Sequence, residues 1–205
     1  MADEAFSTYI LAGGKSSRMC GDKAFLELAG RRLIDRALKI ARQVSPGHVF
    51  LLGPRAKFAA YGRCVQDRFT GAGPLGGIHA ALAETETDLN LVFPVDMPFL
   101  EAQPLRELAA RACASKALVT VSRSTDGCIQ PVVAVFRREF LPVAETALRE
   151  GRFKLDALYD PNWTLVLESE NVGFTREMFD NLNTPEEFAL ASERMGKTSR
   201  ADGKP

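Results

Sequence analysis

The chain has 205 residues, of which 46% are hydrophobic and 25% are charged. This length suits a single α/β domain, and the apolar content is that of a folded globular protein rather than a disordered one. The 26 Lys and Arg residues equal the 26 Asp and Glu residues in number, which argues against nucleic-acid binding by bulk positive charge.

Signals for export, membrane insertion and structural zinc are missing from the sequence. Residues 1–6 contain two acidic residues and no basic stretch before an apolar core, unlike a signal peptide. No apolar run approaches the ~20 residues that cross a bilayer. The four cysteines form no CxxC pair, and the chain has two histidines, which disfavours a zinc site. We therefore expect a reduced, cytoplasmic protein that binds neither membrane nor nucleic acid.

Strand and helix patterns alternate along the chain, and a capping box at Thr184–Glu187 opens a last helix. In chain order, the apolar runs predict strands at 6–11, 48–52, 89–95, 117–122, 129–136 and 163–167. Helical spacing predicts helices at 32–44, 78–83, 104–114, 137–150 and 154–159.

This alternation predicts a three-layer α/β/α fold around a mostly parallel, Rossmann-like sheet. No internal linker or repeat interrupts the pattern, so residues 1–195 are expected to form a single domain. The polar residues 196–205 are expected to form a disordered tail.

A glycine-rich segment follows the first strand directly. Gly13 and Gly14 allow close approach of the backbone to a ligand, and Lys15, Arg18 and Lys23 add three cations within nine residues. Neither the Walker pattern nor the dinucleotide fingerprint matches. The segment favours a polyphosphate bound at the carboxyl end of a strand, and a solvated turn is the alternative.

Two further segments point to the same edge of the sheet. Residues 71–77 contain four glycines and a proline ahead of a helix. Pro94 cannot donate a ladder hydrogen bond, so strand pairing should stop there and leave Asp96 projecting at the sheet edge. A carboxylate in that place can hold Mg²⁺, and a helix or turn cap is the alternative.

Together these segments resemble the molybdenum cofactor guanylyltransferases, which have the nucleotide-diphospho-sugar transferase-like fold. The matching segments, in the family's order, are Leu11-Ala-Gly-Gly-x-Ser-x-Arg-Met19 with Asp22-Lys23, Gly73-Pro-Leu-Gly-Gly77, Val95-Asp-Met-Pro98 and Phe179-Asp-Asn-Leu-Asn-Thr-Pro-Glu186. The resemblance implies transfer of GMP from GTP to the phosphate of molybdopterin, with release of pyrophosphate. It also implies hand-off of a labile product, which would favour transient contacts with molybdoenzymes or their chaperones.

The resemblance assigns individual residues. Arg18 and Lys23 would grip the triphosphate, and Asp96 would hold Mg²⁺, so these three residues form the expected catalytic set. The nucleotide contacts would come from Leu11, Ala12, Gly13, Gly14, Lys23, Asp67 and Asp96. The pterin contacts would come from Gln130, Arg152, Lys154, Asn181 and Asn183.

The chain departs from the family pattern in a few places. Cys20 stands where the family has glycine, and Gln130 replaces the usual histidine before proline. Relatives that use CTP tend to have alanine where this chain has Gly13, which favours guanine. A molybdopterin cytidylyltransferase, another small-molecule nucleotidyltransferase, and a GTP-binding protein without turnover are the alternative hypotheses.

Overall fold

The computed structural model describes residues 6–13 and 22–201, with side chains described as far as Met195. The strands of the main sheet are β1 (Phe6–Leu11), β4 (Val49–Leu52), β5 (Arg63–Val65), β6 (Leu89–Pro94), β7 (Val119–Arg123), β8 (Ile129–Arg137) and β9 (Thr164–Glu168). They form a seven-stranded sheet in the order β5-β4-β1-β6-β8-β7-β9. All neighbours are parallel except β8, which runs antiparallel to β6 and β7.

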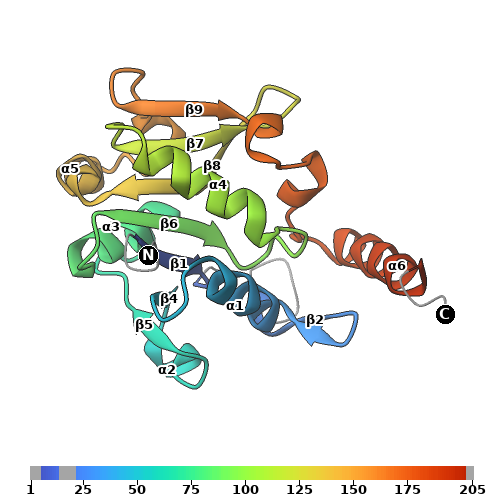
Figure 1. Ribbon diagram of the computed structural model, residues 1–205. Helices are drawn as coiled ribbons and strands as arrows, with labels where there is room; N and C mark the ends of the chain where they lie inside the picture. Colours follow the sequence, from blue (N-terminus) through green and yellow to red (C-terminus); the bar gives the residue numbers. More distant parts are fainter. Residues whose placement is uncertain (1–5, 14–21, 202–205) are drawn as a thin grey trace.

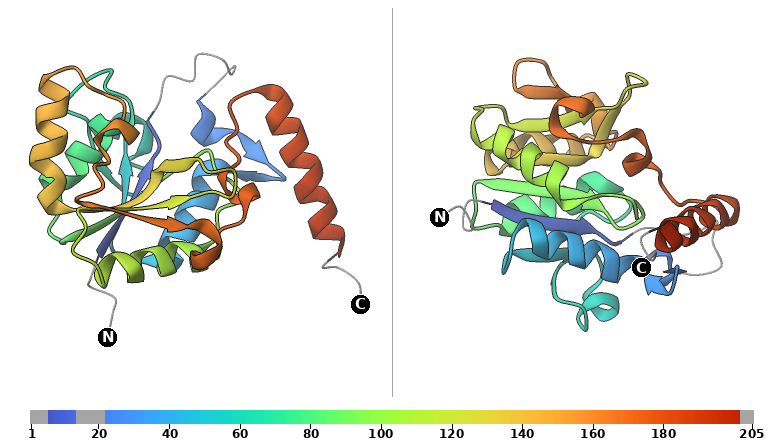
Figure 2. Two further views of the ribbon diagram at one scale, coloured as in Figure 1. Left: turned by 90° about the horizontal axis from the view of Figure 1, so that it is seen from above. Right: turned by 45° about the vertical axis from the view of Figure 1, so that its right-hand side comes forward.

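Helices cover both faces of this sheet (Figures 1 and 2). The α-helices of the described chain are α1 (Leu33–Val44), α2 (Arg55–Phe58), α3 (Pro74–Glu84), α4 (Ala102–Cys113), α5 (Leu141–Arg149) and α6 (Pro185–Ala201). Because side chains alternate along a strand, β1 directs Ile10 toward α1 and α4 and Tyr9 toward α3 and α5. The predicted three-layer, mostly parallel α/β fold is confirmed.

A small hairpin and the last helix lie beside the sheet. The hairpin is made of β2 (Glu27–Leu28) and β3 (Arg31–Arg32), which pair antiparallel. Helix α6 packs next to β2 and stands out from the main body (Figures 1 and 2). Within the described residues, the helices are too short or too polar to span a membrane.

Some elements differ from the sequence-based expectation. Helix α3 begins at Pro74 rather than at residue 78, because Gly73 ends the preceding turn with φ of 61° and proline is well suited to a first helical position. The helix expected at 154–159 is only a 3-10 turn at Asp156–Leu158. Gly151 and Pro161 bracket this stretch and leave too few residues for a stable helix.

Other elements were missed, or end elsewhere. The strands β2, β3 and β5 have two or three residues each, which is too short for a period-two pattern to be visible. Helix α6 continues to Ala201, into the stretch where a disordered tail is expected. Residues 196–201 contain no proline, the residue that most strongly breaks a helix.

Three neighbouring strands end together at one edge of the sheet. The main-chain N–H groups of Ala12 and Gly13 both donate to the Leu52 carbonyl, at 3.0 and 2.8 Å. The Val95 N–H group donates to the Leu11 carbonyl at 3.1 Å, just after Pro94 closes β6. The chain segments that follow β1, β4 and β6 therefore leave the sheet side by side, at the position where open α/β sheets bind ligands.

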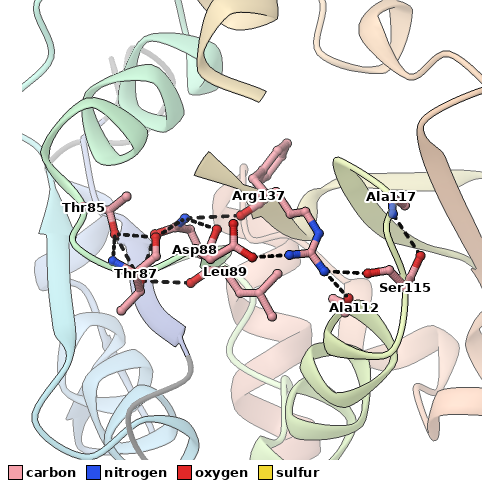
Figure 3. A network of polar contacts seen from close by, with 10 residues as sticks. Thr85, Thr87, Asp88, Leu89, Ala112, Ser115, Ala117 and Arg137 are labelled. Atoms are coloured by element: carbon pink, nitrogen blue, oxygen red, sulfur yellow. Dashed lines mark hydrogen bonds and ion pairs between the residues drawn. The ribbon is translucent and has the colours of Figure 1, made fainter. Parts of the chain in front are cut away.

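The opposite edge of the sheet is held by Arg137, at the end of β8. Its guanidinium donates to the main-chain oxygens of Ala112 and Ser115, at 3.3 and 2.5 Å, and pairs with Asp88 (Figure 3). The side chain is only 16% exposed. Arg137 thus joins the end of α4 to the segment that leads into β6.

Replacing Arg137 by alanine should lower the free energy of unfolding by about 1–3 kcal/mol, because two carbonyl oxygens near a helix end lose a charged donor. Urea denaturation measures the loss. Arg138→Ala is the matched control, since this neighbouring side chain is exposed, and it should change stability by no more than ~0.5 kcal/mol. Equal losses in the two variants would contradict a stabilising role for the Arg137 contacts.

Candidate functional site

Segments far apart in the sequence meet at the edge of the sheet where β1, β4 and β6 end. Lys23 Nζ donates to Asp96 Oδ2 at 3.1 Å and to Asn183 Oδ1 at 2.5 Å. The Leu182 N–H group also donates to the main-chain oxygen of Asp96, at 3.0 Å. The side chains of Lys23 and Asp96 each retain 19% of their exposure. The result is a half-buried cluster of ammonium, carboxylate and amide that a ligand can reach.

Local structure places Lys23 in this cluster. It begins a 3-10 helix at Lys23–Phe25, and Asp22 caps that turn by accepting from the Ala24 N–H group at 3.4 Å. The other oxygen of Asp22 accepts from Lys57 Nζ at 2.8 Å, which ties the turn to α2. The fully buried Ala24 anchors the turn in the core. Lys23 is therefore fixed at its base and points to the sheet edge.

Asp96 lies where the sequence predicts it, directly after β6. The ladder between β1 and β6 ends with Leu11 opposite Pro94, and Asp96 follows two residues later. Asp96 Oδ2 forms an ion pair with the Lys23 ammonium, so a positively charged group already lies beside this carboxylate. No cluster of three or more His, Cys, Asp or Glu side chains that could hold a metal occurs in the part of the chain that the structure describes. A single carboxylate fits Mg²⁺, which in phosphate chemistry is commonly bound by one or two carboxylates together with substrate oxygens.

Asn183 is held by the start of α6. Glu187 Oε2 accepts from the Asn183 and Thr184 N–H groups, at 2.6 and 3.0 Å. Thr184 Oγ1 in turn accepts from the Glu187 N–H group at 3.2 Å. The predicted capping box is confirmed, and its carboxylate also reaches the residue before the cap.

Two glycines bring the ends of β1 and β4 into direct backbone contact. A Cβ atom on Gly13 would lie 3.1 Å from Gly53 Cα. A Cβ atom on Gly53 would lie 2.8 Å from the Phe58 ring and 3.0 Å from Gly13 N. A side chain at either position would push these segments apart. The importance of Gly53 was missed from the sequence, where the only signal was a Gly-Pro pair after a predicted strand.

Asp67 lies against the first turn of α3. Cβ atoms built on Gly76 and Gly77 would each lie 3.4 Å from one of its carboxylate oxygens, which places the carboxylate directly beside these two glycines. Burial raises the pKa of Asp67. A desolvated carboxylate of this kind is an acceptor for N–H or O–H groups of a ligand.

The residues predicted to bind the second substrate gather less tightly. Since β8 is antiparallel to β6, its first residues, including Gln130, lie at the edge where β6 ends. Gln130 Nε2 donates to Ser124 Oγ at 3.2 Å. The Tyr159 hydroxyl donates to the Pro131 carbonyl at 2.6 Å, which ties the segment after α5 to the start of β8.

Arg152 and Lys154 belong to that segment, but their described contacts are local. Arg152 pairs with Glu150 at 2.5 Å and Lys154 with Asp156 at 3.2 Å, both on the surface. Asn181 is also exposed. Among the residues predicted for the pterin side, Asn183 is thus the one whose described contacts reach Lys23.

Part of the glycine-rich segment lies outside the described residues. This part includes Gly14, Lys15, Arg18, Cys20 and Gly21. The N–H groups of Ala12 and Gly13 are already bonded to Leu52. These two N–H groups therefore already have an acceptor within the protein.

Comparison with known proteins settles the family. Residues 8–162 match the MobA-like NTP transferase domain. The chain belongs to this family. It is 34% identical over 188 residues to the molybdenum cofactor guanylyltransferase of Photobacterium profundum, covering 90% of this chain and 94% of that relative. A probable molybdenum cofactor guanylyltransferase of Bacillus subtilis is 30% identical over 198 residues, covering 93% and 96% of the two chains.

Solved structures show the same fold. Molybdopterin-guanine dinucleotide biosynthesis protein A from Archaeoglobus fulgidus superposes with a TM-score of 0.81 at 23% identity, covering 93% of this chain and 99% of the other. Membership of the MobA-like NTP transferase family makes this chain a nucleotidyltransferase, a class of enzyme that uses a divalent metal ion.

Asp67→Asn should stabilise the protein at neutral pH. Since the folded-state pKa of Asp67 is raised, the native protein binds this proton more tightly than the unfolded chain, whose aspartates titrate near ~3.9. Stability is then lost as pH rises from about 4 through the folded-state pKa. The asparagine variant avoids this loss, so its advantage should be present at neutral pH and vanish below about pH 4.

Urea denaturation across this pH range measures the effect. Asp35→Asn is the control, because Asp35 is exposed on α1 and should bring no comparable gain. If Asp67→Asn is less stable than the parent protein at neutral pH, desolvation of the carboxylate is not the main effect of Asp67 on stability.

Proposed function

We propose that this nucleotidyltransferase transfers GMP from GTP to the phosphate of molybdopterin, forming the guanine dinucleotide cofactor and releasing pyrophosphate, with Mg²⁺ as the metal. The observation that carries the proposal is the cluster of Lys23, Asp96 and Asn183, which joins residues assigned to the nucleotide with a residue assigned to the pterin. The names of the relatives support guanine and molybdopterin as the two substrates.

The reaction sets an electrostatic problem that these residues can solve. A phosphate oxygen of the pterin forms a new bond to the α-phosphorus of GTP while the bond to pyrophosphate breaks. Both reactants are anionic, so their approach is unfavourable without nearby positive charge. A monoester phosphate is already ionised near neutral pH, so no general base is needed to activate it.

Lys23 and Arg18 would supply positive charge to the triphosphate and to the departing pyrophosphate. Asp96 would hold Mg²⁺, which when bound neutralises charge on the α-phosphate. Asp67 would accept hydrogen bonds from the nucleotide, and the main chain of Leu11–Gly14 would line the nucleotide-binding site.

The pterin would bind on the side of Lys23 that faces Asn183. Asn181, Asn183 and Gln130 would offer amide groups to the pterin, and Arg152 and Lys154 would offer charge to its phosphate. Arg152 pairs with Glu150 and Lys154 pairs with Asp156. Both ion pairs are exposed and therefore weak enough to be replaced by contacts with a phosphate. We propose that the labile product then passes to molybdoenzymes or their chaperones through transient contacts.

Thermal-shift titration with GTP, CTP, ATP and UTP, each with and without Mg²⁺, tests the nucleotide. A ligand present at 100 times its Kd stabilises the fold by about 2.7 kcal/mol, so the bases can be ranked. We expect a GTP-selective shift that grows with Mg²⁺. A CTP-selective shift would overturn the guanine assignment but keep the chemistry, and no shift with any nucleotide would overturn the proposal.

Asp96→Asn should reduce GMP transfer to molybdopterin on the order of 10²–10³-fold, because the variant loses a charge needed in the transition state. Turnover is measured by pyrophosphate release at limiting Mg²⁺. Glu101→Gln is the control, since this exposed carboxylate lies five residues along the same segment and should leave turnover unchanged. Near-normal turnover by Asp96→Asn would contradict the assignment of the metal ligand.

A further inference from the structure

The first turn of α6 is linked to the nucleotide site through Asn183. Glu187 Oε2 accepts from the Asn183 N–H group at 2.6 Å, and Asn183 Oδ1 accepts from Lys23 Nζ at 2.5 Å. Glu187 itself is exposed and does not touch Lys23 or Asp96 in the described contacts. In the described contacts, Asn183 is the residue that links Glu187 to Lys23.

The contact between Glu187 and Asn183 exceeds what the helix cap requires. A capping box needs one bond from the side chain to the N–H group of the cap residue, which here is Thr184 at 3.0 Å. The additional and shorter bond goes to the residue before the cap, whose N–H group is not one that the helix leaves unsatisfied. Its effect is to fix Asn183.

The segment around Asn183 is fixed on its other side as well. The Leu182 N–H group donates to the main-chain oxygen of Asp96 at 3.0 Å, and the Leu182 side chain is buried. The backbone of Asn183 is therefore held between Asp96 and Glu187. Held in this way, the amide oxygen stays in contact with the Lys23 ammonium.

We infer that Glu187 is a positioning residue, which acts through Asn183 to hold the Lys23 ammonium in place before the nucleotide binds. This inference deepens the proposed function and depends on it for the identity of the ligand. Lysine is among the side chains that lose most rotamer freedom when they are immobilised. A site in which Asn183 and Asp96 already hold the ammonium avoids that loss during binding.

Calorimetric titration with GTP and Mg²⁺ tests the inference. Glu187→Ala should weaken GTP binding by about five- to tenfold, a range typical of residues coupled through one network. Thr184→Ala is the matched control, because it removes the other half of the capping box and leaves the Glu187 contact with Asn183 possible. It should lower Tm by a similar amount and change the Kd by less than about twofold.

Two further variants separate positioning from simple helix stability. Glu187→Gln retains an oxygen that can accept both N–H bonds, so it should restore most of the GTP affinity. In a background of Asn183→Ala, adding Glu187→Ala should weaken binding no further, since Glu187 acts through Asn183. Additive losses in the double variant, or equal losses in Glu187→Ala and Thr184→Ala, would overturn the inference.

The reactivity of Lys23 gives a test that needs no nucleotide. Reductive methylation followed by mass spectrometry should show Lys23 modified severalfold faster in Glu187→Ala than in the parent protein, with the exposed Lys39 as an internal reference. Faster modification in a protein that binds no GTP would sustain the positioning role and overturn the proposed substrate. Unchanged Lys23 reactivity together with normal GTP binding in the variant would overturn the positioning role alone.

Discussion

The common ending of β1, β4 and β6 is the constraint on which the rest of the site depends. The Leu52 carbonyl accepts from two successive N–H groups, those of Ala12 and Gly13, and the Leu11 carbonyl accepts from Val95. Because of these bonds, the three strands end beside one another, and the segments that follow them leave the sheet at the same edge. The same bonds also require the backbones to approach closely, which is possible because Gly13 and Gly53 carry no side chains.

Two opposite charges lie in contact at this edge. Lys23 and Asp96 satisfy each other, and neither is exposed enough to be fully hydrated. A pair of this kind contributes little net stability, because the cost of removing both charges from water offsets their attraction. In the proposed function, the pair would keep both charges in place, so that Lys23 could donate to a phosphate while Asp96 binds the metal ion.

The sequence predicted the parts of the molecule whose signals are local. The strand at Phe6–Leu11, the position of Asp96 after Pro94 and the capping box at Thr184 each follow from residues within a short window, and the structure contains all three. The proposed substrates were predicted from a resemblance to a known family, and the chain belongs to that family.

What the sequence could not predict depends on contacts between distant segments. Lys23 and Asn183 are separated by 160 residues, and nothing local indicates that residues assigned to different substrates share a hydrogen bond. The contact of Gly53 with Gly13 is hidden for the same reason. The strands β2, β3 and β5 were missed because pairing with neighbours, rather than their own two or three residues, makes them strands.

The two ends of the sheet show how stability and function are divided in this fold. At one end, Arg137 uses its charge to join α4, β6 and β8 in contacts that leave little of its side chain exposed. At the other end, partial burial raises the pKa of Asp67, which opposes folding at neutral pH. In the proposed function, the nucleotide would supply a hydrogen-bond donor to this carboxylate. The apolar layers on either side of the sheet and the contacts of Arg137 at the opposite edge offset the cost of burying Asp67.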